Sequence, residues 1–216
     1  MSYRTMRRYA NSDLGEFRNK LFSNQALRVS GAAQVFGTLF HGLLLEAKLA
    51  DDVSPKMTSQ LNAMRESALG NKFLANVLQA AQVEQVRTWV DPLTGLPCKA
   101  QLDIWAAENE LVVDIKTTSA RSYGEFLKSC EDYHYDRQAA FYLDGTPEAK
   151  RFVILGVQKQ APYEVFYFEA SACRGCIEGG RKKYQGLLKG VQRTGFVPSS
   201  WGLKTVPQPT PALHAA

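Results

Sequence analysis

The sequence predicts an α/β fold in which a small mixed central sheet is flanked by helices. Apolar residues recur at helical spacing up to about residue 81, whereas period-two alternation dominates residues 83–118 and further strand-forming segments follow within 151–170. Helix-forming sequence separates and follows these strand segments. This order is typical of a layered domain whose sheet can present polar side chains at one edge.

The length of the chain bounds its domain organisation. Its 216 residues are enough for one domain with a sizeable hydrophobic core. The final run TVPQPTPALHAA holds three prolines and no apolar periodicity, which is typical of a flexible segment. We therefore expect a single domain over residues 1–201 and a flexible tail over residues 202–216.

Three helices are expected before the first strand. Ser12 can cap a short helix that runs through Leu21 and has one apolar face. A second helix is expected over residues 32–49. Ser54 is followed by a proline, a pair suited to a helix cap and first turn, so a third helix should begin there and continue towards Ala81.

The strand segments begin with a meander. Residues 83–118 alternate apolar and polar side chains and contain turn signals at 91–95 and 108–109, so they predict three consecutive antiparallel strands. These strands are expected over residues 83–90, 97–107 and 110–118. Further along the chain, helices are expected at 122–130, 133–143 and about 172–193, and strands at 151–158 and 163–170.

The charge of the chain is unevenly distributed. The net charge is +5, but residues 1–28 hold six Lys and Arg against two acids, and residues 172–216 hold seven against one. Basic ends around an acidic centre suit a protein that holds phosphates and concentrates cations, although a solvated surface has the same composition. The sequence lacks both an apolar run long enough to span a bilayer and a signal-peptide core, so we expect a cytoplasmic protein that does not contact membranes.

The four cysteines contain only one closely spaced pair, the CRGC sequence that begins at Cys173. A zinc or iron–sulfur site takes four soft ligands, and the other two cysteines lie far away in the sequence. We therefore expect reduced thiols rather than a metal cluster.

The segment 101–120 carries charges where a core strand should have none. Side chains alternate along a strand, so Asp114 and Lys116 share one face, and Asp103 on the preceding strand is placed to converge on them. Two carboxylates and the main-chain carbonyl of Ile115 are hard oxygen ligands suited to Mg²⁺. Lys116 would then orient or help deprotonate a water and counter phosphate charge. The D-x-K pattern alone is more typical of an ordinary ion pair on the solvated face of an amphipathic strand.

Two helical segments add candidates to this constellation. His41 lies among apolar residues of the second predicted helix, where it can complete a metal shell or be a core histidine with a satisfied hydrogen bond. Gln138 and Tyr142 are four residues apart and share a helical face. They can brace Lys116 or touch a DNA backbone, although core packing explains Tyr142 equally well.

These motifs together resemble a known family. The segments FGTLFHGLLLE, WVDPLTGLPCKAQLD, VVDIKTTSA and YHYDRQAAFYLDG are similar to the RecE-type exonucleases, also called exonuclease VIII, in the RecB-like branch of the PD-(D/E)XK nucleases. The resemblance covers roughly residues 10–170 and implies a restriction-endonuclease-like core. It implies that His41, Asp103 and Asp114 are metal ligands, that Lys116 is the catalytic lysine, and that Glu84 is an acid supporting the metal-bound water.

The sequence departs from the common motif at two positions. Leu102 replaces the proline that often precedes the first catalytic aspartate, and the second acid is Asp114 rather than a glutamate. Neither change predicts an inactive enzyme. The resemblance implies Mg²⁺-dependent 5′→3′ digestion of duplex DNA ends that leaves 3′ single-stranded tails, with Mn²⁺ substituting and Ca²⁺ binding without turnover. It also implies a ring-like homo-oligomer, a trimer or a tetramer, and a single-strand annealing partner in phage-type recombination.

Basic residues near both ends are candidates for DNA contacts, and Arg28 is the candidate for a 5′-phosphate. The full set is Arg4, Arg7, Arg8, Arg28, Lys182 and Lys183. Two other interpretations of the chain stay open. It can be an endonuclease or a Cas4-like DNA end-processing nuclease with the same metal site, or a DNA-end-binding module without catalytic activity.

Overall fold

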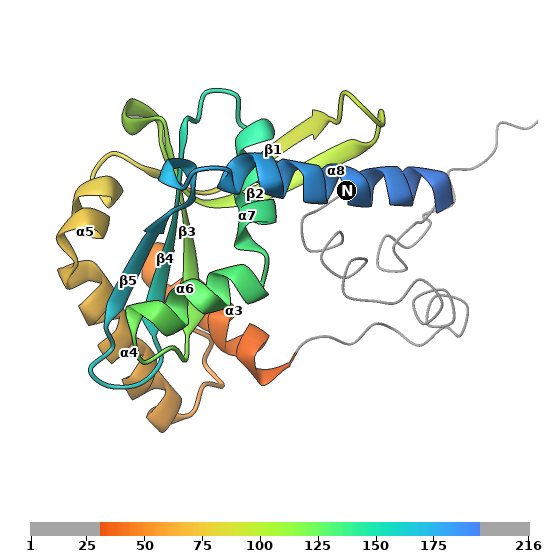
Figure 1. Ribbon diagram of the computed structural model, residues 1–216. Helices are drawn as coiled ribbons and strands as arrows, with labels where there is room; N and C mark the ends of the chain where they lie inside the picture. Colours follow the sequence, from red (N-terminus) through yellow and green to blue (C-terminus); the bar gives the residue numbers. More distant parts are fainter. Residues whose placement is uncertain (1–30, 195–216) are drawn as a thin grey trace, which may run out of the picture.

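The computed structural model describes residues 31–194, which form one five-stranded sheet with helices on both faces (Figure 1). The helices and strands are α3 (Ala32–Leu45), α4 (Pro55–Gly70), α5 (Lys72–Leu78), β1 (Gln82–Val90), β2 (Pro97–Ala106), β3 (Leu111–Thr118), α6 (Tyr123–Asp132), α7 (Tyr135–Asp144), β4 (Arg151–Gln158), β5 (Val165–Glu169) and α8 (Cys176–Thr194). The predicted helix at Ser12 and the predicted tail over residues 202–216 lie outside the described residues.

The sheet is mixed, as the sequence predicts. Its order is β1-β2-β3-β4-β5, with β1, β2 and β3 forming the expected antiparallel meander. Strand β4 runs parallel to β3 because α6 and α7 form the crossover between them, and β5 pairs antiparallel with β4. The strand that carries Asp114 and Lys116 is therefore the middle one, whereas Glu84 lies on β1 at the edge of the sheet.

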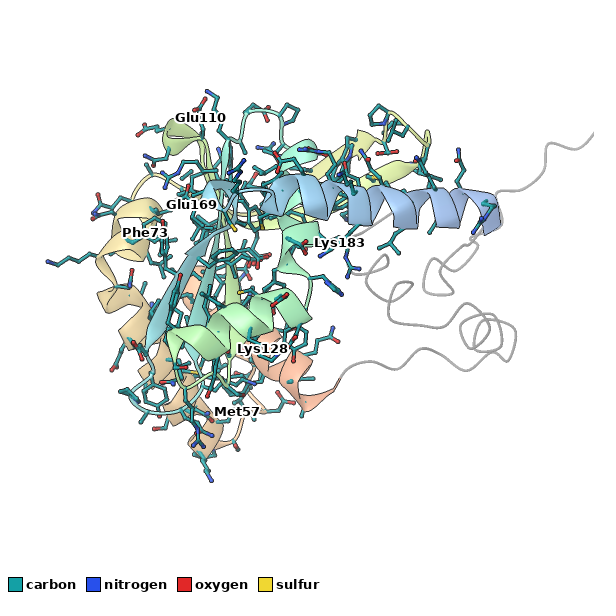
Figure 2. The ribbon with its side chains drawn as sticks, viewed as in Figure 1. Met57, Phe73, Glu110, Lys128, Glu169 and Lys183 are labelled. Carbon is teal, nitrogen blue, oxygen red and sulfur yellow. The ribbon has the colours of Figure 1, made fainter. Side chains whose placement is uncertain are left out.

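Each face of the sheet packs against its own group of helices. Helices α3, α4 and α5 cover one face and bury Phe40, Leu61 and Leu74 completely. Helices α6, α7 and α8 cover the other face, where Phe126 and Phe141 are buried. In Figure 2 the side chains fill both layers around the sheet. Strands β3 and β4 are largely buried on both sides, which explains the continuous apolar run of β4.

Helix ends differ from the predicted ones where local capping intervenes. The Ser54 side chain accepts a hydrogen bond from the Met57 amide, as its position before proline predicts. The helix expected to run towards Ala81 is split, because the side chain of Asn71 accepts from the Leu74 amide and starts α5. Helix α3 ends at Leu45 rather than at residue 49, since the Gly42 carbonyl already accepts the amides of residues 46 and 48.

Helices α7 and α8 are held together by close packing and by a partly exposed ion pair. A Cβ atom at Gly180 would lie 2.0 Å from the Asp136 carbonyl oxygen, so only glycine allows this approach. Arg181 donates two hydrogen bonds of 2.7 Å to the Asp144 carboxylate, and the Tyr184 hydroxyl donates to the same group. Among residues 31–194, no helix is long and apolar enough to cross a membrane.

Candidate active site

Asp103 lies at the point where β2 stops pairing with β3. The ladder between these strands consists of Ala106–Leu111, Trp105–Val112 and Ile104–Val113, and it ends there. Beyond the last pair of the ladder, the Asp103 side chain provides the next hydrogen bond between the strands: its Oδ2 accepts a 2.7 Å hydrogen bond from the Ile115 amide. An acidic side chain thus replaces a main-chain acceptor and is held between the two strands.

His41 reaches the same point from α3. Its Nε2 lies 2.9 Å from the Ile115 carbonyl oxygen, and its Nδ1 lies 3.5 Å from Asp103 Oδ1. A carbonyl can only accept, so Nε2 carries the proton and, in the neutral ring, Nδ1 has the lone pair. Burial lowers the pKa of His41, but the Asp103 carboxylate outweighs this effect and raises the pKa to about 9. Burial acts to raise the pKa of Asp103, yet His41 and Lys116 bring it below its ordinary value.

Glu84 lies on β1 opposite Asp103, between the pairs Val83–Ile104 and Gln85–Leu102. Its φ of 53° is in the left-handed region, which is rare for a non-glycine residue and common at functional sites. The Gln101 side chain donates to Glu84 Oε2. Burial, and then the Asp103 carboxylate, raise the pKa of Glu84 above its ordinary value. A carboxylate with a raised pKa is a stronger base than an exposed one.

Asp114 and Lys116 form an ion pair on the same face of β3, as strand alternation predicts. Lys116 Nζ lies 2.5 Å from Asp114 Oδ2, and the Gln138 side chain donates to Asp114 Oδ1. Burial raises the pKa of Asp114 to about 6, although Lys116 opposes the change. Burial lowers the pKa of Lys116, but the Asp114 carboxylate more than offsets this and the pKa is raised. The lysine is therefore held as an ammonium ion.

The ligand atoms around Asp103 fit a small, hard divalent cation. One ligand atom from each of His41, Glu84 and Asp103 lies within 4.8 Å of the others. Opposite ligands of a six-coordinate ion with bonds of about 2.1 Å are roughly 4.2 Å apart, so the cluster has close to the required span. Asp114 Oδ2 is buried and, among the described residues, makes no hydrogen bond besides its ion pair. Carboxylates with one imidazole suit Mg²⁺ and Mn²⁺.

The sequence matches the family described as PDDEXK-like domain of unknown function (DUF3799) over residues 30–195. The chain belongs to this family. Among curated proteins, none matches this sequence. The match confirms the predicted membership in the PD-(D/E)XK superfamily and includes the five site residues His41, Glu84, Asp103, Asp114 and Lys116 within its bounds.

Solved structures of similar fold include three from bacterial sources. A protein named as a candidate exonuclease from Eubacterium rectale has a TM-score of 0.62 at 14% identity, over 83% of this chain and 74% of that chain. A phage related exonuclease from Haemophilus somnus 129PT has a TM-score of 0.44 at 14% identity, over 76% and 82%. An alkaline exonuclease from Laribacter hongkongensis has a TM-score of 0.43 at 10% identity, over 77% and 83%. The first likeness confirms the predicted restriction-endonuclease-like fold.

The PDDEXK-like domain buries the two residues expected to support the site. Gln138 is 4% exposed and contacts Asp114 rather than Lys116. Tyr142 is hydrogen-bonded to Gln138 and packs edge-on against Phe152, so its position agrees with the core-packing interpretation. Sequence analysis missed Tyr135, whose ring centroid lies 5.0 Å from Lys116 Nζ. Its place three residues before Gln138 on the same predicted helix is the signal that could have identified it.

The candidate DNA-contacting residues are only partly within the described residues. Arg4, Arg7, Arg8 and Arg28 lie outside them. Lys182 is exposed on α8, whereas Lys183 is ion-paired with Asp136 at 2.6 Å, which lowers its capacity to bind a phosphate. None of the four cysteines belongs to the cluster of His41, Glu84 and Asp103.

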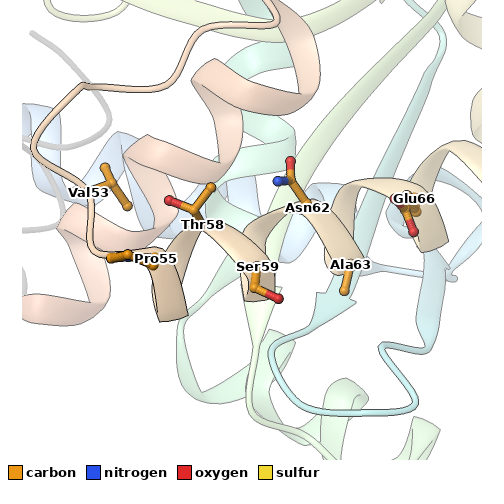
Figure 3. Close-up of a pocket in the computed structure, with 7 residues that line it drawn as sticks. All are labelled: Val53, Pro55, Thr58, Ser59, Asn62, Ala63 and Glu66. Carbon is orange, nitrogen blue, oxygen red and sulfur yellow. The ribbon is translucent and has the colours of Figure 1, made fainter.

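A surface hollow of about 690 Å³ lies elsewhere, over the first half of α4 (Figure 3). Its lining contains one acid, Glu66, and no histidine or cysteine. None of the predicted site residues borders it. The predicted site residues His41, Asp103 and Asp114 therefore gather where β2 and β3 separate, and not at this hollow.

Proposed function

We propose that this protein is a Mg²⁺-dependent 5′→3′ double-stranded DNA exonuclease that leaves 3′ single-stranded tails for phage-type recombination by single-strand annealing. The observation that carries the nuclease proposal is the arrangement of Asp103, Asp114 and Lys116, with His41 and Glu84, at one point of a PDDEXK-like domain. The strand polarity and the recombination role are supported by the resemblance to RecE-type exonucleases.

His41, Asp103 and Asp114 would hold the cation, together with the Ile115 carbonyl and with Glu84 nearby. Nδ1 of His41 is directed towards Asp103 because Nε2 is engaged by the Ile115 carbonyl. Gln138 fixes the Asp114 carboxylate from the opposite side. The bound ion supplies positive charge that polarises the phosphodiester and makes a water more acidic.

Lys116 and Glu84 would have different roles in the reaction, as a hydrogen-bond donor and as a proton acceptor. Because Lys116 keeps its proton, Nζ can donate to a phosphate oxygen and orient a water, but it cannot accept a proton. Glu84 is the better acceptor, since its pKa is raised and its Oε2 is already fixed by Gln101. In this proposal the water oxygen bonds to phosphorus while Glu84 Oε1 takes its proton, and Lys116 counters the charge that develops on the phosphate. The bond from phosphorus to the leaving oxygen breaks, and that oxygen takes a proton from solvent.

We further propose a homo-oligomeric ring, a trimer or tetramer, that works in the cytoplasm with an annealing protein. A ring that surrounds the product strand would account for processive digestion. The support for these points is the sequence resemblance alone.

One assay tests the proposal directly. A 5′-phosphorylated linear duplex and a covalently closed circle are incubated with Mg²⁺, Mn²⁺ or Ca²⁺, and the products are sized. An exonuclease erodes the linear duplex to mononucleotides and leaves the circle intact with Mg²⁺ or Mn²⁺, and it binds DNA without turnover with Ca²⁺. Nicking of the circle would instead identify an endonuclease, and excision of a short end segment a Cas4-like end-processing nuclease.

A pair of lysine variants provides the matched control. Lys116→Ala should abolish hydrolysis and largely retain DNA binding, whereas Lys128→Ala removes an exposed lysine paired with Asp132 and should change neither. Binding without hydrolysis in the wild-type protein would identify a DNA-end-binding module. Equal hydrolysis in both variants would refute the proposed site.

A further inference from the structure

Two tyrosines form a stacked pair beside Lys116. The rings of Tyr133 and Tyr135 have centroids 5.8 Å apart and an interplanar angle of 28°. Tyr135 is 9% exposed and lies against the Lys116 ammonium group, with 5.0 Å between Nζ and the ring centroid. Tyr133 is 49% exposed. The pair thus begins at the site and ends at the surface.

The backbone between the two rings adopts an unusual conformation that makes the stacking possible. Tyr133 and Tyr135 are two residues apart, a spacing that puts side chains on different sides of a helix. The intervening His134 has a φ of 53° and separates the end of α6 from the start of α7. A left-handed non-glycine residue is conformationally strained and is often found at functional sites. Here the strained turn brings two aromatic rings to the same side.

We propose that Tyr133 and Tyr135 form a nucleobase subsite, in which the Tyr133 ring stacks on a base of the DNA strand whose phosphate is held at Lys116. This inference rests on the proposed nuclease function and extends it to substrate positioning. Tyr135 supports the Tyr133 ring and links it to Lys116.

The dimensions of the pair fit a nucleotide close to the cleaved bond. The Tyr135 ring lies 5.0 Å from Lys116 Nζ, and the Tyr133 ring lies 5.8 Å from the Tyr135 ring. Tyr133 is therefore no more than about three nucleotide rises of 3.4 Å from Lys116. Stacking on an aromatic ring accepts every base, because each base has a π-face. Such a contact suits a nuclease that must hold successive nucleotides of any sequence.

Abasic DNA tests the subsite. Affinity is measured in Ca²⁺ for a 5′-phosphorylated duplex, and for duplexes that lack one base at each of the first three 5′ nucleotides. Tyr133→Ala should weaken binding of the intact duplex by about 5- to 150-fold, the range for loss of one stacked base. Tyr133→Phe and Tyr133→Trp should restore binding. At one of the three abasic positions, loss of the base should weaken DNA binding by the wild-type protein by the same factor. At that position, loss of the base should not weaken binding by Tyr133→Ala any further.

Tyr123 offers a matched control, since it is also 49% exposed and its ring lies at the start of α6 against Phe126. Tyr123→Ala should bind the intact duplex as the wild-type protein does. The subsite is refuted if Tyr133→Ala binds the intact duplex as tightly as the wild-type protein does. It is also refuted if removal of a base weakens binding by Tyr133→Ala at every abasic position tested. Hydrolysis in Mg²⁺ that is abolished by Lys116→Ala would then leave the nuclease proposal standing. A wild-type protein that neither binds nor hydrolyses DNA would refute both.

Discussion

Gly180 lies where α8 crosses α7, and its replacement by alanine tests how this contact supports the site. A Cβ atom there would lie 2.0 Å from the Asp136 oxygen, 2.4 Å from the Asp136 carbonyl carbon and 2.9 Å from the Arg137 nitrogen. All three are main-chain atoms of α7, so no side-chain rotation can make room. The two helices would have to separate by roughly 1.4 Å before the 2.0 Å contact became an ordinary one.

The expected cost follows from two opposing effects. Overpacking of a close contact costs about 1–3 kcal/mol, and the upper end applies because backbone must move. Alanine regains about 1 kcal/mol of helix propensity relative to glycine. We therefore expect Gly180→Ala to lower the free energy of unfolding by about 2 kcal/mol, which lowers the melting temperature of a chain of this size by roughly 4–8 °C. Displacement of α7 should also move Gln138 away from Asp114.

Urea unfolding followed by circular dichroism measures this effect, with Gly186→Ala as the control. Gly186 lies on the same helix and a Cβ atom there meets nothing within 4 Å. The control should gain up to about 1 kcal/mol of stability. If Gly180→Ala unfolds at the wild-type urea concentration or above it, the close approach of the two helices does not have the assigned role.

Three further predictions concern charge, the cation and the supporting amide. Arg151 hydrogen bonds hold the pKa of Glu169 at about 2 instead of 4.5, despite opposing burial, so this pair adds stability above pH 4.5 that is lost as the pH falls through 2. After screening the gain is about 1–2 kcal/mol, and urea unfolding of the wild-type protein and Glu169→Gln should converge at acid pH. A cation must displace a proton from His41, whose pKa is about 9 because the Asp103 carboxylate outweighs burial. The affinity for Mn²⁺, measured by calorimetry, should therefore rise up to tenfold per pH unit towards pH 9, and binding should release a proton to the buffer. An affinity that does not change with pH would exclude His41 as a ligand. Gln138→Leu leaves Asp114 Oδ1 without its donor and should weaken Mn²⁺ binding about 10- to 100-fold, with unchanged affinity counting against a supporting role.

Much of the fold was predictable because its elements have strong local signals. The meander over β1, β2 and β3 appears as alternation between turn residues, and β4 appears as a continuous apolar run. The shared face of Asp114 and Lys116 follows from strand geometry alone. Errors arose where a neighbouring residue supplied a cap, as at Asn71, which ends one helix and begins the next.

The partners of the site residues were less predictable. Gln138 was a candidate to brace Lys116 or to touch the DNA backbone, and the packing of α7 brings it to Asp114. The Tyr133–Tyr135 pair depends on the left-handed conformation of His134, and nothing in the local sequence requires that conformation. Glu84 was proposed from family resemblance, since its own strand pattern does not distinguish it from other polar residues on β1.

The site was hard to predict mainly because the alternation of side chains between the two faces of the sheet is interrupted at Glu84 on β1 and at Asp103 on β2. Leu102 packs into the core beneath α7 and Ile104 into the core beneath α3, although alternation assigns both to one face. The same change occurs on β1, where Val83 and Trp89 belong to different cores. A twist at this point ends the β2–β3 ladder, so the Asp103 carboxylate can occupy the space between strands.

That space joins the two layers of the molecule. His41 comes from the layer of α3, whereas Gln138 and Tyr135 come from α7 on the opposite face. In a continuous sheet the backbone of β2 and β3 would separate these groups. Because the ladder stops, Asp103 contacts His41. His41, and then Lys116, hold the pKa of Asp103 below its ordinary value despite burial. The interruption of the sheet is therefore what allows groups from both layers to act on one phosphodiester in the proposed reaction, and it is invisible to any analysis that treats each strand separately.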